Sequence, residues 1–80
     1  MDTKTFLHIT RQVTETVHSI RHAGLHEAAF SFDPENAPQI LSWAIDQGWT
    51  VEEAEWNNPE SLYVGTGTGK APLTVLFFKF

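Results

Sequence analysis

The sequence predicts a two-layer α+β sandwich, with two helices on one face of a four-stranded mixed sheet in the order helix, strand, helix and three further strands. Apolar residues recur every three or four positions over residues 3–23, and again over residues 37–45. Short alternating segments flank the second of these stripes, and residues 71–80 form a strongly apolar stretch. Residues 1–80 fit one small domain of this class.

The first helix is predicted from an apolar stripe made of Phe6, Ile9, Val13, Val17 and Ile20. A strand is the competing interpretation, because the segment is rich in threonine, valine and isoleucine and its odd positions also alternate. Length favours the helix, since some twenty residues without a turn signal are far longer than an ordinary strand. Asp2 is placed to cap its start, and Gly24 to end it.

Residues 27–32 alternate and predict a half-buried strand, with Ala28, Phe30 and Phe32 on one side. The second helix follows, and two beginnings are open. Asp33 caps it with Pro34 in the first turn, or Asn36 caps it with Ala37 and Pro38 following. Its buried stripe is predicted to comprise Ala37, Ile40, Leu41, Ala44 and Ile45. Gly48 then ends the helix as a left-handed cap, and Trp49 folds back over the last turn.

Three strands complete the predicted sheet. Residues 50–56 form one, residues 57–61 a turn, and residues 62–65 the next. A glycine loop precedes the final strand, which we expect to return antiparallel. The first strand, the second helix and the second strand then form a right-handed crossover.

The final strand is apolar on both faces, because Leu73, Val75 and Phe77 alternate with Leu76, Phe78 and Phe80. A layer of helices covers only one face, so we expect the other apolar face to contact a second chain or a partner. The sequence has no cysteine to staple a small fold, which favours support from a second copy. We therefore expect a homodimer, with Leu76, Phe78 and Phe80 at the interface.

Composition excludes some partners. Ten acidic and five basic residues give a formal charge of −5, which disfavours nucleic acid and anionic membrane surfaces. The first residues lack the cationic and apolar regions of a signal peptide, and no stretch is long enough to span a bilayer. We expect a cytoplasmic protein.

The glycine loop, Gly65-Thr66-Gly67-Thr68-Gly69-Lys70, invites comparison with phosphate-binding loops. A Walker A loop requires glycine where this chain has Val64 and serine or threonine where it has Ala71. The Rossmann spacing also fails, because the glycines are evenly spaced and a strand, not a helix, follows. We expect a flexible hairpin loop and no bound cofactor.

Histidines give the sharpest candidate for a metal. His18 and His22 lie one helical turn apart, and Glu15 lies three residues before His18 on the same exposed face. Two histidines at this spacing form a two-point clamp, and Glu15 or His26 would be a third ligand. Adjacent histidines on a solvated helix face are common, however, and the His-Glu-x-x-His spacing of zinc proteases is missing. The favoured interpretation is that they are polar surface residues with a weak contact between Glu15 and His18.

Nothing in the sequence places a nucleophile, base and acid in a catalytic pattern, so the sequence favours a non-enzymatic protein. We predict a small binding or regulatory protein that contacts a basic protein partner through an acidic and aromatic surface. Two alternatives stand beside it: a metal-binding or small-ligand-binding protein that uses the histidine face, and a minimal enzyme with its site at a dimer interface. The predicted partner-binding residues are Trp43, Glu52, Glu53, Glu55, Trp56 and Tyr63.

Overall fold

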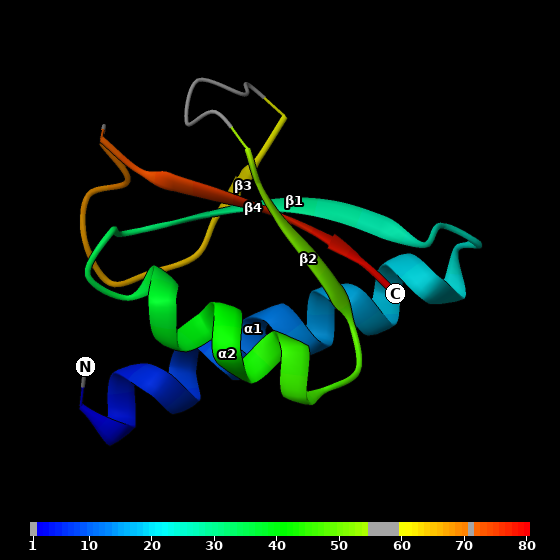
Figure 1. Cartoon of the computed structure of the whole chain (residues 1–80), viewed down its shortest axis with the longest axis horizontal. Helices are drawn as coiled ribbons and strands as arrows, with labels where there is room; N and C mark the ends of the chain where they lie inside the picture. The colour runs from blue at the N-terminus through cyan, green and yellow to red at the C-terminus, as the bar shows by residue number, and fades with distance from the viewer. Residues whose placement is uncertain (1, 55–59, 71) are drawn as a thin grey trace.

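A computed structural model describes residues 2–54, 60–70 and 72–80 and confirms the predicted α+β sandwich. Within these ranges, two helices and four strands follow one another in the predicted order (Figure 1). Their bounds are α1 Thr3–His22, β1 Glu27–Phe32, α2 Ala37–Asp46, β2 Thr50–Ala54, β3 Leu62–Tyr63 and β4 Thr74–Lys79. In the described part of the chain, neither helix has the length and apolar character needed to cross a membrane.

The first helix begins and ends at the predicted signals. The Asp2 side chain accepts a hydrogen bond from the backbone N–H of Thr5 at 2.8 Å, which satisfies a donor that the helix itself leaves unpaired. At the other end Gly24 has φ of +88°. The Leu25 N–H then donates to the carbonyl of Ile20 at 3.1 Å. Such a left-handed ending is one that glycine adopts without steric cost.

The start of α2 matches the second of the two predicted alternatives, because the helix begins at Ala37, directly after Asn36. The Asn36 side chain, however, makes no capping hydrogen bond. The turn is closed instead by the backbone carbonyl of Asp33, which accepts from the N–H groups of Asn36 and Ala37 at 2.9 and 3.2 Å. The Asp33 carboxylate instead accepts a hydrogen bond from Tyr63. Pro38 lies in the first turn, where a missing N–H does no harm.

The end of α2 is as predicted. Gly48 has φ of +88°, and the Trp49 N–H donates to the carbonyl of Ala44 at 3.3 Å. Trp49 is thereby turned back over the sheet, with its ring centre 5.9 Å from that of Phe78. This contact fixes the end of α2 against the strands.

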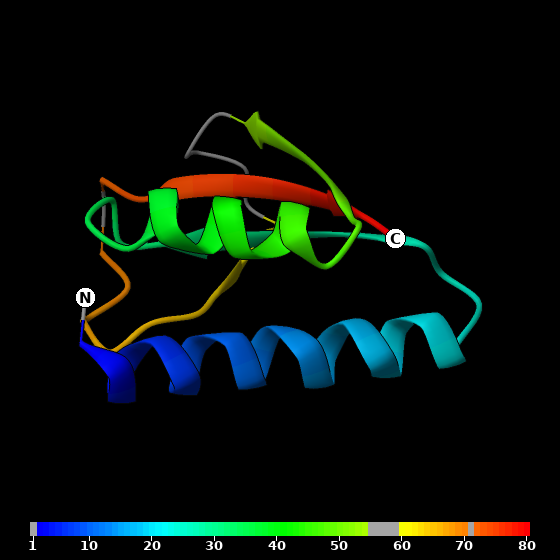
Figure 2. The same ribbon diagram turned by 60° about the horizontal axis from the view of Figure 1, so that its bottom comes forward.

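The sheet order is β2-β4-β1-β3, so the strand that is last in sequence lies between β1 and β2. β4 is antiparallel to both neighbours, with Phe30 opposite Leu76 and Val51 opposite Phe78. β3 pairs parallel to β1 over two positions, Phe30 with Leu62 and Ser31 with Tyr63. Both helices lie on one face of this sheet, below the strands in Figure 1. Figure 2 shows α2 in front of the strands and α1 running alongside. β3 and β4 are not neighbours, because β1 lies between them, so the loop that joins them is not the predicted hairpin.

The core lies between the helices and this covered face. On α1 the predicted stripe is confirmed, with Ile9 and Val13 fully buried and Val17 2% exposed. Phe6 and Ile20, at its ends, are half-buried. The stripe predicted for α2 is correct except at one position, because Ile45 is 56% exposed.

Two of the three residues predicted at a dimer interface do not lie at the surface. Leu76 and Phe78 are fully buried inside the chain's own core. The Phe78 ring centre lies 5.2 Å from that of Phe30, so a second copy has no access to either side chain. Phe80 is half-buried against the same core. The helices cover the Leu76 and Phe78 face, and the opposite face carries Val75 and Phe77.

Candidate functional site

Trp43 occupies the helical layer, on the side of α2 that faces α1. Its ring meets the edge of Trp49 at a centre distance of 5.4 Å and an interplanar angle of 87°. Trp49 in turn contacts Phe78 and the half-buried Phe80. The core therefore holds Trp43 from behind, while part of its ring remains exposed. A rigid, partly exposed aromatic ring is well suited to contact a partner.

Two shallow hollows meet at Trp43, and we call them together the interhelical groove. One has a volume of about 450 Å³ and the other about 460 Å³. The first is lined by Leu7, Thr10, Arg11, Thr14, Glu15, Trp43 and Gln47, and the second by Phe6, Pro38, Gln39, Ser42, Trp43 and Asp46. The apolar side chains that line it are those of Phe6, Leu7, Pro38 and Trp43, and Leu7 is 56% exposed.

One polar group inside the groove, the Thr10 hydroxyl, has partners within its own helix. The Thr10 hydroxyl donates toward the carbonyls of Phe6 and Leu7, at 2.9 and 3.3 Å. The charged side chains are more exposed than Thr10, with Glu15 and Arg11 beside one hollow and Asp46 beside the other. The groove thus combines an apolar floor with a charged margin, as protein-binding surfaces commonly do.

The acidic residues predicted for the same surface lie elsewhere. Glu52 and Glu53 are exposed on β2, at one edge of the sheet. An oxygen of Glu52 lies 3.8 Å from the ammonium nitrogen of Lys79, and both side chains are more than half exposed. Solvent screens such a pair strongly, so it contributes little to stability. Glu55 and Trp56 lie outside the described residues.

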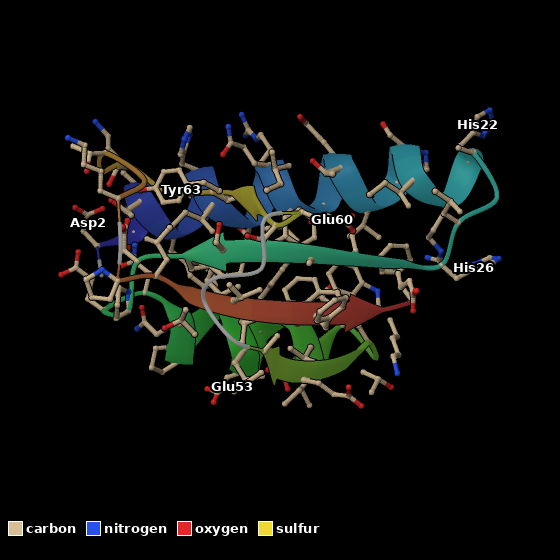
Figure 3. All side chains as sticks on the ribbon, turned by 90° about the horizontal axis from the view of Figure 1, so that it is seen from above. Asp2, His22, His26, Glu53, Glu60 and Tyr63 are labelled. Carbon is tan, nitrogen blue, oxygen red and sulfur yellow. The ribbon has the colours of Figure 1, made fainter. Side chains whose placement is uncertain are left out.

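Tyr63 lies at the opposite edge of the sheet, on β3 (Figure 3). Its hydroxyl donates to Oδ2 of Asp33 at 2.9 Å and accepts from the N–H of Gly67 at the same distance. Burial raises the pKa of the Tyr63 phenol, and the hydrogen bond to Asp33 raises it further. The structure does not bring Tyr63 together with Trp43 or with the acidic residues of β2.

The glycine loop has a structural role that the sequence pattern did not reveal. A Cβ on Gly65 would lie 2.5 Å from the Tyr63 hydroxyl oxygen, and one on Gly67 would lie 3.3 Å from it. Gly69 has φ of +73°, and a Cβ there would meet the Tyr63 ring at 3.2 Å. Every second residue of the loop thus faces Tyr63 or Asp33. The alternating glycines allow the backbone to pass close to this pair.

The histidine face of α1 is exposed. His18, His22 and Glu15 all project from the solvent side of the helix, and Figure 3 shows His22 and His26 at the same end of the molecule. Across residues 2–54, 60–70 and 72–80, histidine, aspartate and glutamate do not form a group of three or more that would hold a metal ion. The structure thus adds no third ligand to the predicted pair.

Sequence reasoning identified Trp43 but missed its neighbours. Leu7 carried a signal, because it is a large apolar residue that lies off the buried stripe of its helix. Trp43 lies off the stripe of the second helix in the same way. The sequence does not show how the two helices lie relative to one another, so it could not show that Leu7 and Trp43 line the same groove.

Comparison with protein-family models, with curated proteins and with solved structures gives no significant match. Function must therefore be inferred from the residues themselves.

Proposed function

We propose that the protein is a small non-enzymatic binding or regulatory protein that contacts another protein through the interhelical groove. The observation that carries this proposal is the position of Trp43, which lines both hollows and keeps part of its ring exposed. Tryptophan is enriched among the residues that dominate binding energies, especially near the centre of a concave contact. Leu7 beside it adds apolar area that a partner would remove from water.

The charges around the groove favour a partner segment that is apolar at its centre and basic at its margin. Glu15 lines one hollow and Asp46 the other, and Arg11 supplies one opposing charge. The whole chain carries −5, which accelerates the encounter with a positively charged surface. An apolar side chain would enter beside Trp43, and neighbouring lysine or arginine residues would lie near the acids.

A matched pair of substitutions tests this proposal. Leu7→Glu places a charge inside the groove, and Ile45→Glu places the same charge on a helical residue that lines neither hollow. Both native side chains are 56% exposed, so the two variants should be similarly stable. Wild type and both variants are immobilised, and proteins captured from the source cells are quantified by mass spectrometry.

We expect a captured protein that binds the wild type and Ile45→Glu and is lost with Leu7→Glu. Its dissociation constant, measured with the purified partner, should rise at least about tenfold, equivalent to about 1.4 kcal/mol. A partner that binds both variants equally would place the contact surface elsewhere. If no captured protein distinguishes the two variants, the groove is not a protein-binding site.

A further inference from the structure

In the part of the chain that the structure describes, one edge of the sheet is only partly paired. All six residues of β1 pair with β4, but only Phe30 and Ser31 pair with β3 on the other side. Among the described residues, no strand pairs with positions 27–29 along that edge. Figure 3 shows β1 continuing toward His26 beyond the short β3. A sheet edge of this kind is a template for an added strand.

The backbone of Glu27 faces this open edge. The Phe80 N–H donates to the carbonyl of His26 at 2.8 Å, so His26 is oriented toward β4. The Val64 N–H donates to the carbonyl of Ser31 at 2.9 Å, so Ser31 is oriented toward β3. Successive residues of a strand direct their backbone groups to alternate sides. Glu27 therefore directs both its N–H and its carbonyl outward, where a partner strand would pair with them.

A hollow of about 310 Å³ lies beside the same residues. α1 contributes Ile20 to it, and β3 contributes Leu62, which is 52% exposed. Ala28 and Ala29 leave the space open because their side chains are small. This volume is at the lower limit of the range for small-molecule pockets, which is about 300 to 1,000 Å³. A few side chains of a peptide fit it better than a large ligand.

The two faces of the hollow differ in chemistry. Ile20 lies under the helix-covered face and supplies an apolar surface. Glu27 projects from the opposite face together with Phe77, because strand alternation places both on the face without helices. Lys79 is opposite Glu27 in the register, yet its ammonium group approaches Glu52 on the far side. Glu27 is the acidic residue that β1 contributes to the hollow, and the described lining residues include no lysine, arginine or histidine. Glu60 also lines the hollow but already has an interaction partner, so the charge argument rests on Glu27.

We propose that the open edge of β1 binds an extended segment of a partner protein in which apolar and basic side chains alternate. The segment adds a strand beside Glu27, and its backbone pairs with the outward N–H and carbonyl of that residue. Its apolar side chains enter toward Ile20 and Leu62, and its basic side chains lie on the Glu27 face. This site is separate from the interhelical groove, so either proposal can fail without the other.

The test uses a synthetic hexapeptide of alternating lysine and valine, titrated into ¹⁵N-labelled protein. Amide chemical shifts should change at residues 27–29, and hydrogen exchange of the Glu27 amide should slow as the site fills. Two control peptides isolate the causes. One replaces each lysine with glutamate and removes the charge complementarity, and the other is methylated on alternate backbone nitrogens and cannot complete the strand pairing. We expect neither control peptide to bind measurably.

Two exposed glutamates provide the matched variants. Glu27→Lys should raise the dissociation constant of the peptide at least fivefold, and Glu53→Lys, with the same charge change on β2, should leave it within twofold. Leu7→Glu should also leave it unchanged, which separates this site from the groove. The proposal is overturned if the two lysine variants weaken binding equally, if the glutamate peptide binds as well, or if the shift changes lie away from β1.

Discussion

Alanine substitutions in the glycine loop should have very unequal effects on stability. A Cβ on Gly65 would lie 2.5 Å from the Tyr63 hydroxyl oxygen and 2.7 Å from Oδ2 of Asp33. At Gly67 the corresponding distances are 3.3 and 3.5 Å. Gly65→Ala must therefore displace the hydroxyl and break its hydrogen bond to Asp33. Gly67→Ala requires only a small movement of the same atoms.

The magnitudes follow from these contacts. Overpacking costs about 1 to 3 kcal/mol, and a hydrogen bond to a charged group contributes about 1.5 to 3 kcal/mol when fully buried. Because Tyr63 and Asp33 are both partly exposed, we expect Gly65→Ala to lower the free energy of unfolding by about 2 kcal/mol, or about 10 °C in melting temperature. For Gly67→Ala the reduced entropy of the unfolded chain offsets the small clash, and the change should stay within about 0.5 kcal/mol.

Urea denaturation, followed by the fluorescence of the three tryptophans, measures both values. Tyr63→Phe removes the hydroxyl that Gly65→Ala displaces, so the double variant should lose less stability than the two single losses combined, by at least about 0.5 kcal/mol. Equal destabilisation by the two alanines, or full additivity with Tyr63→Phe, would refute this account of the loop.

Three further predictions concern titration and the core. The folded-state pKa of Tyr63 is raised, so its contribution to stability is complete below the ordinary pKa of 10.0 and is lost as pH rises through the folded value. Because Tyr63 is the only tyrosine, phenolate absorbance should titrate above 10.0 in the folded protein and near 10.0 in denaturant; coincident curves would contradict this. The pKa of Asp2 is lowered, chiefly by the hydrogen bond from Thr5, so its contribution is present above 3.8 and lost as pH falls through the folded value. The acid destabilisation measured by urea midpoints should therefore be smaller in Asp2→Asn. Phe78→Lys buries a charge in the core and should give an unfolded chain by circular dichroism, whereas a folded monomer would show that Phe78 is accessible.

Local sequence signals predicted most of the elements. Asp2, Gly24 and Gly48 defined helix ends because caps and left-handed turns depend on a few neighbouring residues. Apolar periodicity likewise predicted which side of α1 is buried. Ile45 was assigned to the core by the same rule, but it lies at the margin of the helix face, where the sheet no longer covers it.

Relations between distant segments were not predictable in this way. Leu76 and Val75 have similar side chains on opposite faces of β4, so the sequence gives no basis for choosing which face the helices cover. The pairing of Tyr63 with Asp33 joins residues 30 positions apart. The sequence feature that accompanies this pairing is the alternation of glycines at positions 65, 67 and 69. That pattern can be interpreted only when Tyr63 is known to face the loop.

The central position of β4 also bears on how the chain folds during synthesis. β1 and β2 are both made early, but they do not touch one another, because β4 lies between them. Glu27 pairs with Lys79 across roughly 50 residues of chain. Nearly all of the described chain must therefore have left the ribosome before the sheet forms, and we expect Phe30 and Phe32 to lack their folded-state contacts with β4 until then. We expect nascent chains that stop before Thr74 to remain unfolded and to bind chaperones that recognise apolar segments.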